Sequence, residues 1–335
     1  MVISRTPFRI SFFGGGTDYP VWYKDNRGAV LTVSINKYCY LTCRYLPPFF
    51  KHKSRIIWSE IEYVKGISEI RHPSARECLR FMDIKKGVEI HHDGDLPART
   101  GMGSSSSFTV GLLHALYALK GIMPTKRQLA LDAIHLEQEV MKENVGSQDQ
   151  AQAAFGGFNL IEFGGKDHIM VRPMTINPDR LAHFHSHLML FYTGLSRTAS
   201  EIAAEQIRCT PYKKKELHMM HGFVNDAIEI LNGNSRLSEF GKLLHENWLI
   251  KRSLSHKIST TAIDRMYSTA IRAGASGGKL LGAGGGGFML IFAKPENQHE
   301  IREKLKKLLY VPFRFEDLGS QIIFYSPGDS LTSPV

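Results

Sequence analysis

A stretch rich in glycine and serine carries residues of the types that hold phosphate. It reads Asp95-Leu-Pro-Ala-Arg-Thr-Gly-Met-Gly-Ser-Ser-Ser-Ser-Phe108, and a helical pattern of apolar residues runs on from Phe108. A glycine loop before a helix can gather backbone N–H groups at the helix N-terminus, where the helix dipole favours an anion. The stretch therefore suits a cradle for nucleotide phosphates, although the same residues also suit a turn followed by a serine-capped helix.

Two familiar phosphate-binding signatures do not match this loop. A P-loop requires a lysine directly after its last glycine, whereas Ser104 follows Gly103 here. The catalytic-loop and DFG sequences of protein kinases are also missing from the chain. Phosphoryl chemistry at this loop would therefore belong to another fold.

Three acidic residues lie beside predicted turns. Asp18 follows the glycines of residues 14–16, and its carboxylate could accept hydrogen bonds from a polyhydroxylated ligand. Glu137 lies late on a predicted helix, and Asp149 begins the next element. Two such carboxylates can meet at one metal ion or at one reacting hydroxyl. The alternative is that all three are solvated acids on turns and helix surfaces.

A second glycine-dense stretch covers residues 274–287 and contains two motif matches. Gly-x-Ser-x-Gly around Ser276 matches a hydrolase nucleophile, and Gly-x-Gly-x-x-Gly at 282–287 matches a dinucleotide fingerprint. Both motifs require a strand before them and a helix after them. Here a helix precedes and the β-rich run 288–292 follows, which disfavours both functions. We expect instead a glycine loop that packs closely against another segment, such as the loop before Phe108.

The positioning elements follow from hydrophobic periodicity. Strands are predicted at 2–13 (as a pair), 29–35, 38–45, 88–93, 158–163, 188–192, 288–292, 311–315 and 321–325. Helices are predicted at 74–82, 105–121, 125–143 (capped by Thr125), over most of 198–273, and at 296–309. The alternating His183, His185 and His187 are assigned to a loop rather than to a metal site. Prolines at 173 and 178 indicate a boundary between domains 1–175 and 176–335.

Composition limits the class of protein and its partners. The chain of 335 residues is 43% hydrophobic, and its four cysteines form no CxxC pair. We find no membrane-spanning run and no signal peptide, so we expect a cytoplasmic protein without a membrane partner. The net charge of +10 favours anionic ligands, but the basic residues are scattered apart from 213–215. A small phosphorylated molecule is therefore favoured over nucleic acid. The oligomeric state, monomer or homodimer, stays open.

Three stretches in this order resemble the motifs of the GHMP kinase superfamily. They are Thr6–Arg9 with Gly14–Tyr19, then Pro97–Ser105, and then Lys279–Gly287, and together they span nearly the whole chain. The resemblance implies a two-domain α+β GHMP kinase fold with the active site in the cleft between the domains. It also implies an enzyme that uses ATP and Mg²⁺ to phosphorylate a hydroxyl group.

The resemblance further implies roles for individual residues. Asp149 would be the catalytic base, Arg9 would lie beside it, and Ser105 and Glu137 would ligate Mg²⁺, with Ser104 or Ser106 as alternatives to Ser105. The ATP-binding residues would be Pro97, Arg99, Gly101, Met102, Gly103, Ser104, Ser105 and Ser106. The substrate-binding residues would be Gly16, Thr17, Asp18, Arg197, Lys279, Gly284 and Gly285. Arg99, Arg197 and Lys279 are the candidates for holding a second phosphate on the substrate.

The first motif separates the chain from one branch of the superfamily. Galactokinase-like members carry Glu-His where this chain has Gly15-Gly16. The Gly-Gly-Gly-Thr-Asp version is similar to that of D-glycero-D-manno-heptose 7-phosphate kinases and of the kinase part of fucokinases. The resemblance implies phosphorylation of the anomeric (C1) hydroxyl of a sugar phosphate, on a route to nucleotide-activated heptose and surface glycans. A kinase of another sugar, such as L-fucose, and a non-catalytic nucleotide-binding protein are the alternatives.

Overall fold

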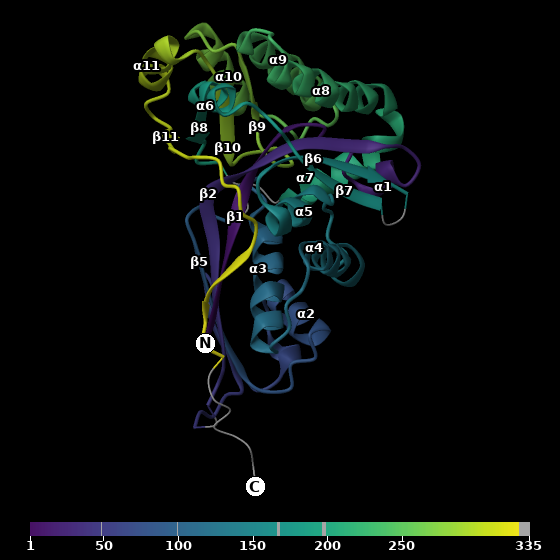
Figure 1. The fold of residues 1–335 in the computed structure, drawn as a ribbon, viewed down its shortest axis with the longest axis vertical. Coiled ribbons are helices and arrows are strands. Elements are labelled where there is room, and N and C mark those ends of the chain that lie inside the picture. Colours follow the sequence, from purple (N-terminus) through teal and green to yellow (C-terminus); the bar gives the residue numbers. More distant parts are fainter. Residues whose placement is uncertain (48, 99, 166–167, 196–198, 328–335) are drawn as a thin grey trace.

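The computed structural model describes residues 1–47, 49–98, 100–165, 168–195 and 199–327, which form two parts stacked along the long axis of the molecule (Figure 1). The N-terminal half of the chain fills most of the lower part in that view, and helices from the C-terminal half form the upper part. Within the described residues the strands form an eight-stranded sheet and a four-stranded sheet. The architecture therefore combines helices and sheets in two parts, as predicted.

Two long antiparallel strands, β1 (Val2–Phe13) and β2 (Gly28–Tyr45), form the centre of the larger sheet. The sequence predicts two strands in each segment, and this is wrong for a physical reason. Pro7 pairs with Tyr38 while Phe8 pairs with Ile35, so residues 36–37 form a bulge that resembles a break in the sequence pattern. The second half of β1 is also buried on every residue, which removes the polar alternation of a half-exposed strand.

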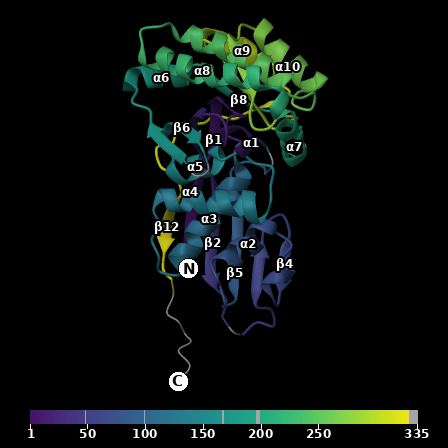
Figure 2. The ribbon, with the colours of Figure 1, turned by 90° about the vertical axis from the view of Figure 1, so that its right-hand side faces the viewer.

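The larger sheet has the order β12-β1-β2-β5-β3-β4, with β6 pairing with both β2 and β7. Its other strands are β3 (Ser54–Ile57), β4 (Ile61–Val64), β5 (Val88–Gly94), β6 (Phe158–Gly164), β7 (His168–Pro173) and β12 (Gln321–Tyr325). The accompanying helices are α1 (Pro20–Tyr23), α2 (Pro73–Phe81), α3 (Ser104–Leu119), α4 (Lys126–His135) and α5 (Gln148–Phe155). Helices α2 to α5 lie on one face of this sheet (Figures 1 and 2). The Thr125 hydroxyl caps α4 by accepting a hydrogen bond from the backbone N–H of Gln128, as predicted.

The smaller sheet has the order β11-β8-β10-β9 and lies under the C-terminal helices (Figure 1). Its strands are β8 (Leu188–Tyr192), β9 (Gly277–Leu280), β10 (Phe288–Phe292) and β11 (Leu309–Tyr310). The helices are α6 (Pro178–Ser186), α7 (Ala199–Cys209), α8 (Lys214–Asn232), α9 (Leu237–Ser253), α10 (Thr261–Arg272) and α11 (Pro295–Lys304). None of the helices in the described ranges combines the length and apolar character needed to span a lipid bilayer.

Three expectations for the C-terminal half are wrong. Residues 277–280 belong to a stretch expected to be a glycine loop, but they form strand β9, which pairs with β10. His183 and His185 lie on α6, not in a loop, because Asn177 caps this helix by accepting from the backbone N–H of Asp179 at 2.9 Å. Residues 311–315 form no strand and make only an isolated bridge between Phe315 and Ile35. Across the described residues no group of three or more histidine, cysteine or acidic side chains is placed to hold a metal ion.

An aromatic cluster joins the two parts of the molecule. Phe12 lies at the end of β1. The centroid of its ring is 5.5 Å from that of Phe184 on α6 and 5.6 Å from that of Phe240 on α9. The rings of Phe184 and Phe240 lie 4.7 Å apart in an edge-to-face arrangement. All three side chains are fully buried. Because such pairs add packing energy to their burial, this cluster holds the C-terminal helices on the end of β1.

The chain returns to the larger sheet at its C-terminal side, where β12 pairs antiparallel with β1. Gly156, at φ +70°, lies against the segment that leads into β12, and a Cβ atom there would lie 2.0 Å from the backbone nitrogen of Gly319. The predicted domain boundary near residue 175 falls between β7 and α6, and it stays a prediction.

We predict that Gly156→Ala lowers the free energy of unfolding by at least about 3 kcal/mol, because it combines left-handed backbone strain with a backbone clash. Gly121→Ala is the matched control, since Gly121 has φ +73° but has no atom near its missing Cβ, and it should cost only about 1 kcal/mol. Urea unfolding measures both variants. Equal losses would show that contact with the segment before β12 contributes nothing.

Candidate active site

The glycine-serine loop ends at the N-terminus of α3. Gly101 and Gly103 have φ values of +80° and +77°, a conformation that a residue with a side chain adopts only at a cost. The Thr100 hydroxyl closes the loop by donating to the Pro97 carbonyl at 2.8 Å. Most side chains of α3 are buried, so the helix gives the loop a fixed base. Arg99, a predicted ATP-binding residue, lies outside the described residues.

The second glycine stretch packs against this loop, which confirms the predicted close contact. A Cβ atom on Gly282 would lie 2.3 Å from the Cα atom of Gly101. A Cβ atom on Gly287 would lie 2.1 Å from the Thr100 carbonyl oxygen. The N-terminal and C-terminal parts of the chain therefore meet backbone to backbone at the predicted phosphate loop, with no room for side chains.

Arg9 and Asp149 form a two-pronged ion pair beside this junction. Arg9 Nε and Nη2 donate to the two carboxylate oxygens of Asp149 at 2.7 and 2.8 Å. Arg9 Nη1 donates to the Gly101 carbonyl at 2.7 Å. The Arg9 side chain is only 5% exposed, whereas that of Asp149 is 26% exposed. The arginine therefore fixes the orientation of a carboxylate that a substrate can still reach.

Asp18 lies close to this pair and is itself buried. Its carboxylate accepts from the backbone N–H of Gly16 and from Gln148 Nε2, each at 2.9 Å. Burial raises the pKa of Asp18, and the nearby negative charge of Asp149 raises it further. The Thr17 hydroxyl donates to the Gly14 and Ala29 carbonyls, so Thr17 stabilises the turn that carries Asp18.

A π-helix at Leu136–Val140 continues α4 and carries Glu137 into the core. Its wider turn is closed by the backbone N–H of Met141, which donates to the Leu136 carbonyl at 2.8 Å. Glu137 is fully buried, and burial raises its pKa to about 7. Its Oε2 atom accepts from the Ser106 hydroxyl at 2.8 Å and from Gln150. The structure thus pairs Ser106 with Glu137, while Ser105, the predicted ligand, is exposed.

The Ser106–Glu137 pair fits a magnesium ion. Glu137 Oε1 is buried and has no hydrogen-bond partner among the described residues. Mg²⁺ prefers oxygen ligands and is commonly held by one or two protein groups together with substrate phosphates. Glu137 and the Ser106 hydroxyl would supply those protein oxygens. When bound there, the ion would neutralise phosphate charge next to the glycine loops.

The remaining predicted site residues have mixed positions. Lys279 is buried, and its ammonium donates to the Ser11 and Phe12 carbonyls at 2.8 and 2.7 Å, so it ties β9 to β1. The backbone N–H of Gly285 donates to Ile258, and Gly284 packs against the same residue. Arg197 lies outside the described residues. Substrate binding by these residues stays a prediction.

Sequence reasoning missed Lys251, a buried cation on α9. Its ammonium donates to the Gly282 carbonyl at 2.5 Å, at the junction of the two glycine loops. Burial lowers its pKa to about 8, and the positive charge of Arg9 contributes. The sequence did contain a signal. Lys251 lies seven residues after Leu244 and three after Trp248, which places it on the apolar stripe of α9 and so predicts a buried lysine.

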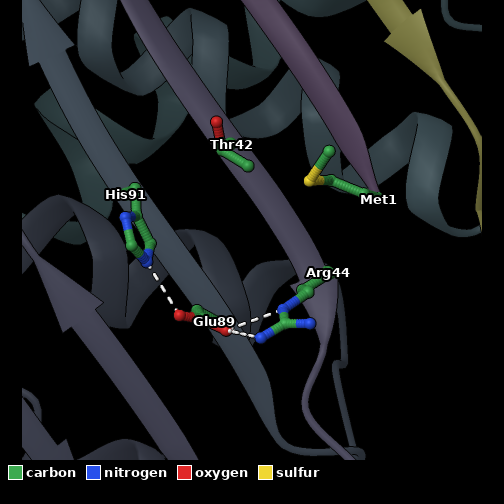
Figure 3. Close-up of a pocket in the computed structure, with 5 residues that line it drawn as sticks. All are labelled: Met1, Thr42, Arg44, Glu89 and His91. Carbon is green, nitrogen blue, oxygen red and sulfur yellow. Dashed lines mark hydrogen bonds and ion pairs between the residues drawn. The ribbon is translucent and has the colours of Figure 1, made fainter.

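A separate cavity of about 210 Å³ lies on β1, β2 and β5, away from these residues. Figure 3 shows its lining, which consists of Met1, Thr42, Arg44, Glu89 and His91. Glu89 is already paired with Arg44, Arg55 and His91. The cavity contains none of the predicted site residues and leaves no carboxylate of its own free for chemistry.

Comparison with known proteins places this site in a family. The model of the GHMP kinases N-terminal domain matches residues 63–157, and that of the GHMP kinases C-terminal domain matches residues 226–311. The chain belongs to the GHMP kinase family. As a GHMP kinase it is an ATP-dependent phosphotransferase with a hydroxyl acceptor. The predicted family and two-domain fold are thereby confirmed.

Individual relatives lie at moderate sequence distance. This GHMP kinase is 28% identical to a D-glycero-alpha-D-manno-heptose 7-phosphate kinase of Campylobacter jejuni, over 91% of this chain and 93% of that protein. It is 26% identical to an L-fucokinase/L-fucose-1-P guanylyltransferase of Bacteroides fragilis, over 96% of this chain but 38% of that protein. The structure of a D-glycero-D-manno-heptose 1-phosphate kinase from Bacteroides thetaiotaomicron superimposes with a TM-score of 0.79 at 23% identity, covering 97% of this chain and 100% of that one. That likeness shows a shared fold.

The unequal exposure of Arg9 and Asp149 predicts unequal effects of mutation on stability. Asp149→Ala should lower the free energy of unfolding by about 3 kcal/mol, because it leaves a buried guanidinium without its carboxylate. Arg9→Met should cost about 1 kcal/mol, because the more exposed Asp149 can be solvated. Urea unfolding of both variants and of the double variant measures the coupling. A larger loss in Arg9→Met than in Asp149→Ala would contradict this account.

Proposed function

We propose that this GHMP kinase transfers the γ-phosphoryl group of ATP to the anomeric hydroxyl of D-glycero-D-manno-heptose 7-phosphate, giving the 1,7-bisphosphate. The observation that carries the proposal is the oriented Arg9–Asp149 pair next to the contact between the two glycine loops. Similarity to the Campylobacter jejuni heptose 7-phosphate kinase over nearly the full length of both chains supports the choice of sugar. A cytoplasmic location would follow from the use of ATP.

In the proposed mechanism Asp149 receives the proton of the attacking hydroxyl. Arg9 holds both carboxylate oxygens, so the position of the base is set before the substrate arrives. The backbone around Gly101 and Gly103 would face the nucleotide phosphates at the start of α3. Asp18 would accept hydrogen bonds from sugar hydroxyls. Phosphoryl transfer depends mainly on such positioning and on charge neutralisation.

L-Fucose is the second candidate acceptor, because the chain is also similar to the Bacteroides fragilis L-fucokinase/L-fucose-1-P guanylyltransferase. An unphosphorylated sugar would need no cation for a distal phosphate. The two candidates therefore differ in whether the substrate carries a second phosphate, and a substrate panel distinguishes them.

ADP release with Mg-ATP should be strong on D-glycero-D-manno-heptose 7-phosphate and weak on mannose 6-phosphate, sedoheptulose 7-phosphate, L-fucose and galactose. Asp149→Asn should lower kcat by about a hundredfold or more, because it removes the proton acceptor. A coupled assay measures turnover, and circular dichroism checks that the variant is folded. Turnover on an unphosphorylated sugar alone would reject heptose phosphate as the acceptor while leaving the kinase activity established. Full activity in Asp149→Asn would reject Asp149 as the catalytic base.

The contact between Ser106 and Glu137 supports Ser106 over Ser105 as the proposed magnesium ligand. Ser106→Ala should raise the Mg²⁺ concentration for half-maximal activity by about tenfold, because the Ser106 hydroxyl contacts Glu137. Ser105→Ala is the matched control, and it should leave that concentration nearly unchanged because Ser105 is exposed. Titrations of MgCl₂ at fixed ATP measure both. The reverse order of effects would assign the metal to Ser105.

A further inference from the structure

Two cations from distant parts of the chain are fixed to the two touching glycines. Arg9, on β1, donates to the Gly101 carbonyl at 2.7 Å. Lys251, on α9, donates to the Gly282 carbonyl at 2.5 Å. Because Gly101 and Gly282 are in direct backbone contact, the guanidinium and the ammonium are both bound to one junction. This arrangement is the starting point of the inference.

The hydrogen bonds of Lys251 leave it capacity for a ligand. A lysine ammonium has three donors, and among the described residues Lys251 makes one hydrogen bond, to the Gly282 carbonyl. Lys279, the neighbouring buried lysine, donates to two carbonyls and serves as a tether between β9 and β1. Both side chains are almost fully buried. A buried ammonium with spare donors is costly unless an anion or another acceptor joins it.

A second buried polar group lies on the same face of α9. Asn247 precedes Lys251 by one helical turn and is fully buried. Neither the oxygen nor the nitrogen of its side-chain amide has a hydrogen-bond partner within the described ranges. The buried stripe of α9 therefore contains two polar residues, one helical turn apart, toward its C-terminal end. Apolar packing alone does not account for polar residues at these two buried positions.

The surrounding charges favour an anion at this place. The buried cations are Arg9, Lys251 and Lys279, and the acids that act on Lys251 are Asp18 and Asp149. Burial raises the pKa of Asp18 and lowers the pKa of Lys279, which disfavours the charged form of both groups. Two cations, Arg9 and Lys251, then remain beside the carboxylate of Asp149, and this balance suits a phosphoryl group.

We propose that the Lys251 ammonium binds an oxygen of the phosphoryl group that is transferred, beside the Gly101–Gly282 junction to which Arg9 also donates. The inference rests on the proposed placement of the ATP phosphates at the glycine loops, and it is independent of which sugar accepts the phosphoryl group. It gives the C-terminal part of the chain a direct role in holding the γ-phosphate through α9.

The ionisation of Lys251 gives the inference a pH signature. Burial lowers the pKa of Lys251 to about 8, so in the free protein the ammonium is lost as the pH rises above that value. The charges that face it are Arg9 on β1, Asp18 before α1, Asp149 on α5 and Lys279 on β9. A bound phosphoryl dianion would favour the protonated form, so binding of the γ-phosphate should weaken above about pH 8.

Calorimetric titration with MgADP and with the magnesium complex of AMPPNP, a non-hydrolysable ATP analogue, tests the inference without turnover. In Lys251→Met the affinity for AMPPNP should fall at least about tenfold, while that for ADP should change less than about twofold. Lys242→Met is the control, since Lys242 is an exposed lysine on the same helix that pairs with Glu239, and it should bind both ligands normally. Equal losses for the two nucleotides, or none, would overturn the inference.

The pH dependence of nucleotide binding supplies a second test, which does not require that Lys251→Met folds. In the wild-type protein the preference for AMPPNP over ADP should decline above about pH 8, and Lys251→Arg should remove that decline because arginine stays charged. A preference that is constant from pH 7 to 9 in the wild-type protein would overturn the inference. If the substrate panel fails while these binding results hold, the heptose assignment fails and the role of Lys251 stands.

Discussion

The contact between Gly101 and Gly282 is the constraint on which the rest of the site depends. The Gly101 backbone occupies the space that a Cβ atom of Gly282 would need, and the Leu281 carbonyl occupies the space that a Cβ atom of Gly101 would need. The contact brings a loop at the start of α3 against a loop between β9 and β10, two segments far apart in the sequence. Since the carbonyls at this contact accept from Arg9 and Lys251, the same constraint sets the distance between the cations. A side chain at either glycine would separate both the loops and the charges.

The site combines rigidity and exposure in different residues. Arg9, Asp18 and Glu137 are buried and held by several hydrogen bonds, whereas Asp149 keeps part of its carboxylate accessible. Such a division suits a reaction in which little covalent chemistry falls to the protein and most of the acceleration comes from fixed charges. The π-helix at Leu136–Val140 contributes to this division between buried and exposed groups. Its wider turn directs the carboxylate of Glu137 into the core, whereas a regular helix would orient that side chain differently.

Local signals made much of this structure predictable from the sequence. The glycines before Ser104 and the Thr125 cap each reflect backbone chemistry, and both predictions are confirmed. Around residues 274–292 the prediction holds in part, because β10 follows the glycine stretch but strand β9 forms inside it. Features that depend on tertiary contacts were missed. In the sequence pattern, the bulge at residues 36–37 is indistinguishable from the end of a strand. Lys251 likewise looks like one of several charged residues on an amphipathic helix. The Asn177-Pro178 start of α6 was an available signal, since these residue types favour a helix N-cap and its first turn.

The pairing of β12 with β1 has a consequence for how the protein is made. Because residues 14–320 separate the two strands, β1 remains without its outer neighbour during synthesis until β12 has been made. During that interval β1 has one unpaired edge, which is a template for unwanted strand addition by other chains. The bulge between Ile3 and Ser4 interrupts the regular register of that edge. Closure of the sheet thus depends on pairing between segments far apart in the sequence, which is intrinsically slow.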